Sequence, residues 1–280
     1  MKIKLITVFV VLVSSVVFSQ SAKLLNTFGK FENGFSISIS MNGYIYITDS
    51  YANELFKYDS LGTMLKYIGG YGWDDSQFDD PVDVYATTLN VYVADKNNNR
   101  IQIFDKDLNF LSAFTTKNNE NSNLQFAYPT ACGVSGQGDL FILDSDNNRI
   151  LKYNLTGEFL QEIGGVDAGD YSIENPKSFA ISKHGNVYVL EENKIILFDQ
   201  YGNGLQKINL KTPVENINIS LNYLILIFNK KIRLLNLIDN LPAGEISLQK
   251  IPAISDAAIY GQKLYVLSPQ NLLVYKFEIE

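Results

Sequence analysis

Short apolar runs alternate with polar turns along almost the whole chain. The runs YIYITD, VYVAD and LFILD end at Asp49, Asp95 and Asp144, and a second apolar run such as RIQIFD or RILKYN follows each polar turn. Aliphatic and aromatic residues that alternate over about five positions, bounded by turn residues, are typical of β-hairpins. The pattern therefore predicts an all-β protein.

The hairpins recur as six units. The runs VYVLE, LILIF and LYVLS continue the series, although the last two lack the terminal acid. Prolines recur at matching intervals of 48, 47, 37 and 39 residues, at Pro81, Pro129, Pro176, Pro213 and Pro252. Because proline has no N–H to donate to a ladder, we expect these residues to mark the starts of strands.

A further apolar run closes each unit. These runs are MLKYIGG at 64–70, FLSAFTT at 110–116, FLQEIGG at 159–165, LQKINL at 205–210 and EISLQKI at 245–251. The sixth unit has no such run, but KLLNTFG at 23–29 has the same form and precedes the first unit. Four-stranded units repeated radially form a β-propeller. The sequence thus predicts six four-stranded antiparallel blades, the last closed by the N-terminal strand at 23–29.

The repeat resembles a known family. The order F-x-x-P, an apolar strand, VYVAD, NNRI and a strand ending in IGG is similar to the NHL repeat of six-bladed propellers. The resemblance is strong in the second and third units and weak in the fifth and sixth. It implies a single NHL-type propeller over residues 20–280.

The first residues form a separate segment. Lys2 and Lys4 precede an apolar run from Leu5 to Phe18, and the small residue Ser19 follows. This order predicts a secretory signal over residues 1–19, because the run is shorter than the ~20 residues of a spanning helix. We therefore expect an exported protein, periplasmic or extracellular, with no membrane span in the mature chain.

Charge and cysteine content narrow the possible partners. The chain has 23 Lys and Arg against 30 Asp and Glu, and removal of residues 1–19 leaves 21 basic residues, a net charge near −9. Such a surface repels phosphate, so we do not expect nucleic acid as a partner. Cys132 is the only cysteine, so stability must come from packing and not from an internal disulfide.

A nearly identical stretch occurs twice, as DKNNNRIQIFD from Asp95 and DSDNNRILKYN from Asp144. The pairs Asp95 with Arg100 and Asp144 with Arg149 flank the turn between the second and third strands. We expect them to form hydrogen bonds within the blade, with Asn residues of the turn at positive φ.

The longest connections between units are candidates for a binding surface, because long loops on a rigid scaffold carry function. The chain direction in a propeller places them on one face, with the turns between second and third strands. The candidate residues of two such loops are Tyr71, Trp73, Asp74, Asp75, Asp167, Asp170 and Tyr171. Aromatic residues beside carboxylates suit a protein, peptide or carbohydrate ligand. Alternatively, Trp73 packs between blades and the acids only face water.

The central channel is a second candidate site. The register of the innermost strands directs Asp83, Glu215 and Asp256 toward the axis, where three acids would suit calcium. Similar six-bladed propellers include calcium-dependent lactonases, so the resemblance implies a calcium-assisted hydrolase or lactonase at the channel mouth as an alternative function. No other cofactor is expected.

Other catalytic chemistry has little support in the sequence. His184 is the only histidine and lies in a predicted turn, so a three-histidine zinc site is excluded. The register places Cys132 in the core. We therefore interpret the chain as a non-enzymatic binding module.

Overall fold

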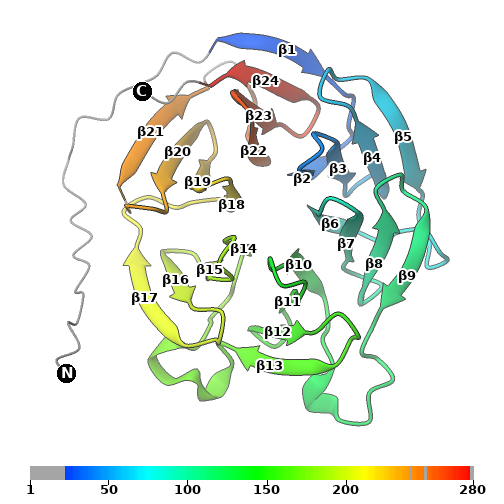
Figure 1. Ribbon diagram of the computed structural model, residues 1–280, viewed down its shortest axis with the longest axis vertical. Helices are drawn as coiled ribbons and strands as arrows, with labels where there is room; N and C mark the ends of the chain where they lie inside the picture. Colours follow the sequence, from blue (N-terminus) through cyan, green and yellow to red (C-terminus); the bar gives the residue numbers. More distant parts are fainter. Residues whose placement is uncertain (1–22, 240, 249–250, 278–280) are drawn as a thin grey trace.

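In the computed structural model, which describes residues 23–239, 241–248 and 251–277, six four-stranded sheets surround a central axis (Figure 1). The predicted signal at 1–19 lies outside the described residues. Within them, no helix is long and apolar enough to cross a bilayer. The prediction of an all-β, six-bladed β-propeller is confirmed.

Each of the first five blades is an antiparallel meander built from consecutive strands. Blade 1 contains β2 (Gly34–Ile39), β3 (Ile45–Asp49), β4 (Glu54–Tyr58) and β5 (Met64–Gly69). Blade 2 contains β6 (Pro81–Ala86), β7 (Asn90–Asp95), β8 (Arg100–Asp105) and β9 (Phe110–Phe114). Blade 3 contains β10 (Pro129–Val134), β11 (Leu140–Asp144), β12 (Arg149–Tyr153) and β13 (Phe159–Ile163).

The remaining blades follow the same plan. Blade 4 contains β14 (Ser178–Ile181), β15 (Val187–Leu190), β16 (Lys194–Phe198) and β17 (Gly204–Asn209). Blade 5 contains β18 (Asn216–Ser220), β19 (Tyr223–Phe228), β20 (Lys231–Asn236) and β21 (Pro242–Ser247). Blade 6 contains β22 (Asp256–Tyr260), β23 (Lys263–Leu267), β24 (Leu272–Lys276) and β1 (Leu24–Phe28). Two short 3-10 helices, η1 (Ser122–Leu124) and η2 (Val166–Tyr171), lie in connections.

The N-terminal strand closes the ring, as the sequence predicts. β1 pairs antiparallel with β24, with Leu24 opposite Tyr275 and Phe28 opposite Leu272. The N–H of Lys276 also donates to the carbonyl of Lys23 at 2.9 Å. The outer edge of β24, which would otherwise be unpaired, is therefore covered.

The prolines mark strand starts less uniformly than predicted. Pro81 and Pro129 are the first residues of β6 and β10, whereas Pro176, Pro213 and Pro252 lie two to four residues before their strands. The closing strand of blade 5 also begins at Pro242, three residues before the predicted start at 245. Proline has no N–H to bond, so it fits at the first residue of this outer strand as well.

The core lies between neighbouring blades. One cluster joins Tyr46 and Leu55 of blade 1 to Phe78, Val93 and Phe104 at blade 2, and all five side chains are buried. Successive side chains of a strand point to opposite faces of its sheet, so each blade packs against the neighbouring blade on either side. The period-2 pattern therefore appears in all units.

The two faces of the ring differ in their connections. We call the face with the blade-to-blade connections and the turns between second and third strands the long-loop face. The other face has the turns between first and second and between third and fourth strands, and we call it the short-turn face. Hydrogen bonds join the elements of each face: Asn98 Nδ2 donates to the Gly72 carbonyl on the first, and Asn42 Nδ2 to the Thr88 carbonyl on the second.

Candidate functional site

The repeated acid ties the incoming connection to each blade. Asp95 is fully buried and accepts hydrogen bonds from the backbone N–H of Asp79 at 2.8 Å and from Arg100 Nε at 2.7 Å. Burial raises the pKa of Asp95, and these hydrogen bonds oppose that rise. Asp144 holds the N–H of Ala127 and Nε of Arg149 in the same way. The expected bonds within the blade are confirmed.

Arg100 also fixes the loop that contains the only tryptophan. Its Nη1 donates to the carbonyl of Trp73 at 2.7 Å, and its Nη2 donates to the carbonyls of Asp74 and Gln77 at 3.0 and 2.9 Å. The Asn98 amide holds the Gly72 carbonyl of the same loop. The repeated Arg thus converts a connection of eleven residues into a fixed surface, which reduces the entropy lost on binding.

This fixed loop presents aromatic side chains to solvent. Trp73 is 74% exposed and Tyr71 is 69% exposed, so the alternative in which Trp73 packs between blades is wrong. Tyr51, in the neighbouring turn, is 76% exposed and was not predicted from the sequence. The N–H of Gly70 donates to the carbonyl of Asn53 at 2.8 Å, which joins the turn of Tyr51 to the loop. We call Tyr51, Tyr71 and Trp73 the aromatic cluster.

Carboxylates accompany the aromatic cluster. Asp74 and Asp75 directly follow Trp73 and are exposed. Asp79 and Asp80 are half-buried, and Asp80 forms an ion pair of 2.6 Å with Lys96. The two acids next to Trp73 are therefore the ones that present their charge to solvent.

The second candidate loop differs from the first in the environment of its tyrosine. Asp167 and Asp170 are exposed in η2, but Tyr171 packs against the core of blades 3 and 4. Its ring contacts Phe198, with centroids 6.3 Å apart, and Lys207 Nζ lies 5.4 Å from its centroid. The structure thus places both loops on one face, two blades apart. Among the described residues, no hydrogen bond joins them.

A third set of contacts fixes the long-loop face from blade to blade. Asn53, Asn99 and Asn148 end their turns at positive φ, as the sequence suggested for the last two. Their Oδ1 atoms accept from the N–H of the residue just before the proline that leads into the next blade, at 2.8 Å for Asp80, 2.7 Å for Tyr128 and 3.1 Å for Asn175. The Asn at the end of the turn therefore joins consecutive blades.

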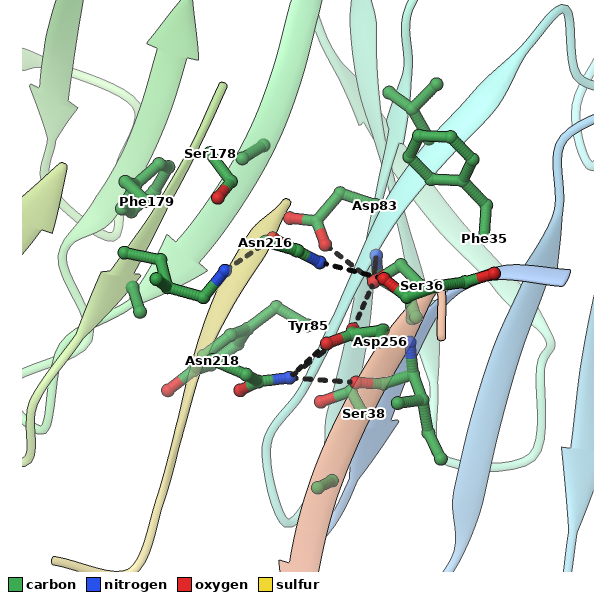
Figure 2. A pocket seen from close by; sticks show the side chains of 18 of the residues that line it. Phe35, Ser36, Ser38, Asp83, Tyr85, Ser178, Phe179, Asn216, Asn218 and Asp256 are labelled. Atoms are coloured by element: carbon green, nitrogen blue, oxygen red, sulfur yellow. Dashed lines mark hydrogen bonds between the residues drawn. The ribbon is translucent and has the colours of Figure 1, made fainter. Parts of the chain in front are cut away.

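The central channel forms a cavity of about 580 Å³ (Figure 2). Ser36 Oγ lies 2.8 Å from Asp83 Oδ1 and 3.5 Å from Asp256 Oδ2, so the two acids meet at one serine. Asp83 also accepts from the N–H of Cys132 at 2.8 Å, and Asp256 from the N–H of Ile37 at 3.0 Å and from Asn218 Nδ2 at 3.2 Å. These bonds connect the innermost strands of five blades.

Both channel acids titrate near neutral pH. Burial raises the pKa of Asp83 to about 6 and that of Asp256 to about 7, and hydrogen bonds from Cys132 and Ile37 oppose these rises. Asp83 adds a small repulsion to Asp256. The sequence placed these acids at the axis, but it did not identify Ser36 and Asn218 as their partners.

The predicted calcium set does not assemble in the described structure. Glu215 lines the cavity but is exposed, and among the described residues no hydrogen bond connects its carboxylate to Asp83 or Asp256. No group of three or more His, Cys, Asp or Glu within the described ranges has an arrangement that could hold a metal ion. Because calcium takes six to eight oxygens and these carboxylates already accept several hydrogen bonds, the channel does not fit a calcium site.

The two remaining residues lie where the sequence placed them. His184 is exposed in the turn between β14 and β15, on the short-turn face. Cys132 is buried in the core between blades 2 and 3, and burial raises the pKa of its thiol well above the ordinary value. A neutral, enclosed thiol is a poor nucleophile.

The NHL repeat profile matches residues 78–104 of the chain. The chain is similar to Protein brain tumor of Drosophila melanogaster, 32% identical over 153 residues, which are 53% of this chain and 14% of that protein. It is 30% identical to B-box type zinc finger protein ncl-1 of Caenorhabditis elegans over 53% of this chain and 17% of the relative. NHL repeat-containing protein 3 of Mus musculus is 25% identical over 53% of this chain and 45% of the relative. The chain thus spans less than half the length of these relatives.

Solved structures share the fold at low identity. Virginiamycin B lyase from Staphylococcus aureus superposes with a TM-score of 0.59 and 15% identity, over 93% of this chain and 90% of the lyase. A streptogramin B lyase superposes with a TM-score of 0.61 and 13% identity, over 93% and 97% of the two chains. At this identity, the similarity concerns the arrangement of the blades.

Proposed function

Because this chain is an NHL-repeat, six-bladed β-propeller, we propose that it is a binding module that engages its partner with the aromatic cluster on the long-loop face. The observation that carries the proposal is the exposure of Trp73 on a loop that Arg100 holds by three hydrogen bonds. An exposed tryptophan on a preorganised loop is typical of a binding hot spot.

The chemistry of the surface favours a protein or peptide with cationic side chains. Asp74 and Asp75 lie beside Trp73 without an ion pair to a basic residue in the described structure. Aromatic rings and free carboxylates together bind Lys and Arg through cation–π contacts and charge-assisted hydrogen bonds. A carbohydrate would use the same rings through stacking, and salt dependence separates the two ligands, since binding to a neutral sugar is insensitive to salt.

Export belongs to the same proposal. Residues 1–19 have the order of a secretory signal, and a partner in the periplasm or outside the cell would meet the long-loop face there. The alternative function, a calcium-assisted hydrolase or lactonase, receives no support from the channel, whose acids are occupied by hydrogen bonds to neighbouring strands.

Partner capture from extracts of the source organism tests the proposal. Trp73→Ala should weaken capture about thirtyfold, because truncation of an anchoring aromatic costs ~2 kcal/mol or more. Asp74→Asn with Asp75→Asn should weaken capture mainly at low salt. His184→Ala, on the short-turn face, is the control and should have no effect. Capture that survives both long-loop changes but fails with the control would contradict the proposal.

A further inference from the structure

The first strands of the six blades contribute equivalent residues to one ring around the channel. In each blade, one such residue pairs with the position that precedes the repeated acid or its counterpart, and we call these six residues the channel ring. In blade order they are Ser36, Asp83, Ala131, Ser178, Asn216 and Asp256, and all of them line the cavity. Asp83 and Asp256 therefore flank Ser36. Ser178 belongs to blade 4, which lies across the channel from blade 1 (Figure 1).

The two acids of the channel ring have one hydroxyl donor between them (Figure 2). Ser36 Oγ lies 2.8 Å from Asp83 Oδ1 and 3.5 Å from Asp256 Oδ2, and a serine hydroxyl has a single proton to donate. The shorter distance assigns that proton to Asp83. The space between the carboxylates therefore lacks a donor when both acids are ionised. A proton on Asp256 supplies it at low pH, and a ligand with several N–H donors would supply it at higher pH.

The charge of the cavity favours a cationic ligand. The charged and titratable side chains that line it are Asp83, Asp256, Glu215, Lys177, Tyr85 and Cys132. Three carboxyl groups thus face one ammonium group, and Lys177 is exposed. Asn218 Nδ2 bonds to Asp256, and its Oδ1 accepts no hydrogen bond from any described residue. The cavity therefore offers acceptors to a cation and repels an anion.

Hydroxyl groups without partners lie in the other walls of the cavity. Ser178 Oγ and Thr130 Oγ1 are buried and have no hydrogen bond among the described residues. The hydroxyl of half-buried Tyr85 also has none within the described part of the chain. Buried hydroxyls in folded proteins normally have a partner. Because these three have none in the protein, a rotation toward a ligand in the cavity would break no hydrogen bond.

We propose that the channel binds a small molecule with a primary ammonium group and several hydroxyl groups, such as an amino sugar or an amino alcohol. The ammonium lies between Asp83 and Asp256, and the ligand hydroxyls face Ser178 and Tyr85. An ammonium has three N–H donors and a carboxylate about four lone-pair sites, so acids that already accept hydrogen bonds are sufficient for it. The volume of about 580 Å³ lies in the range of small-molecule sites. This site is separate from the aromatic cluster.

Binding of an ammonium should release protons. Burial raises the pKa of Asp83 to about 6 and that of Asp256 to about 7. A cation between the two carboxyl groups favours their ionised forms, so both pKa values fall in the complex. The ligand must therefore displace protons at low pH, and its affinity should rise at least about tenfold from pH 5 to pH 7.

Isothermal titration calorimetry of the full chain tests the ligand class with three sugars of one skeleton. Glucosamine has the ammonium group, glucose is neutral and glucuronate is an anion. At pH 7, glucosamine should bind at least about tenfold more tightly than glucose, because its hydrogen bonds to the carboxylates are charge-assisted. Glucuronate should not bind. Titrations in buffers that differ in protonation enthalpy should show the release of protons on binding of glucosamine.

Three channel variants test the location. Ser178→Ala and Tyr85→Phe each remove a hydroxyl that has no hydrogen bond within the described structure, so the denaturation midpoint should not fall. Each should weaken glucosamine binding about threefold to tenfold, because a hydrogen bond to the ligand is lost. Asp256→Asn should weaken binding at least about tenfold and reduce its rise between pH 5 and pH 7. Asp146→Asn, at an exposed acid outside the channel, is the control and should leave binding unchanged.

Each result decides for or against the proposal. Preference for glucosamine that the channel variants weaken and the control does not supports it. Failure of glucosamine to bind, equal binding of glucose, or binding that Ser178→Ala and Asp256→Asn leave unchanged would overturn it. Binding lost instead in Asp74→Asn with Asp75→Asn would place the amine at the aromatic cluster and also overturn it. A lysine side chain of a protein partner is the other possible occupant, and binding of Nα-acetyl-lysine amide in place of glucosamine would show that the proposed class is wrong.

Discussion

Arg100 Nη1 donates a hydrogen bond of 2.7 Å to the backbone carbonyl of Trp73, 27 residues earlier in the chain. The same guanidinium is bonded to the buried carboxylate of Asp95. A residue of the structural repeat therefore positions the loop that presents Tyr71 and Trp73 to solvent. Under the proposed function, this one side chain couples stability to binding.

Arg100→Ala should weaken both folding and binding. It leaves Asp95 buried without its charge partner, which costs about 3–5 kcal/mol in comparable sites. Chemical denaturation measures the loss, and tryptophan fluorescence anisotropy should fall as the loop becomes mobile. Lys96→Ala breaks only the half-exposed pair with Asp80 and should cost less than about 1 kcal/mol. Equal costs for the two variants would contradict the role of Arg100.

The closing strand should be essential for stability. A chain that starts at Lys30 lacks β1 and exposes the edge of β24, whereas a chain that starts at Lys23 keeps the pairing. We expect the shorter chain to lose several kcal/mol, on the order of the whole stability of a domain. Thermal denaturation of the two chains measures the difference. Identical melting temperatures would show that β1 does not close the ring.

The channel acids should make the protein less stable as pH rises. The folded pKa of Asp256, about 7, lies above its ordinary value of 3.8, so folding favours the protonated form. This contribution is complete below about pH 4 and is lost as pH rises through 7, and the change is on the order of a few kcal/mol. Asp83 acts in the same direction through about pH 6.

Asp256→Asn should flatten this dependence, because the variant has no charge to bury at pH 8. Unfolding free energies at pH 5 and pH 8 measure the effect. Asp146→Asn, at an exposed acid, is the matched control and should leave the slope unchanged. A steeper slope in Asp256→Asn than in the unaltered chain would show that the charged form is the stabilised one.

The Asn residue at the end of the turn combines two roles that substitution can separate. Asn99→Gly keeps the positive φ of 53° but loses the hydrogen bond to Tyr128, and should cost about 1 kcal/mol. Asn99→Ala loses both and should cost about 1–2 kcal/mol more, because a Cβ disfavours the left-handed region. Denaturation midpoints of both variants measure the difference. Ala at least as stable as Gly would show that the backbone conformation carries no cost.

Much of the architecture could be read from local patterns. Each blade repeats the same period-2 hairpins, and the deficit of one strand at the C-terminus matched a surplus strand at 23–29. Both follow from the sequence because each blade needs four strands to bury its faces. The last strand of blade 5 was predicted less accurately, because the strand that begins at Pro242 lacks the closing motif of the other blades.

The candidate sites could be predicted only in part. The sequence identified Trp73 and its acids because a long connection with a tryptophan is visible in one dimension. It grouped Tyr171 with them, although Tyr171 packs on Phe198. It placed Glu215 with Asp83 and Asp256, although the partner that completes the channel network is Asn218. Whether a loop residue faces solvent or core depends on contacts with residues far away in the chain.

The sequence by itself determined the fold, the number of blades and the positions of the turns, because these depend on residue periodicity and on turn chemistry within about 50 residues. The tertiary structure decided what these strands and turns bring together: the loop of Trp73 onto Arg100 and the channel acids onto Ser36. The contact of Asp256 with Ser36 depends on the closure of the ring, which juxtaposes residues that no local pattern connects.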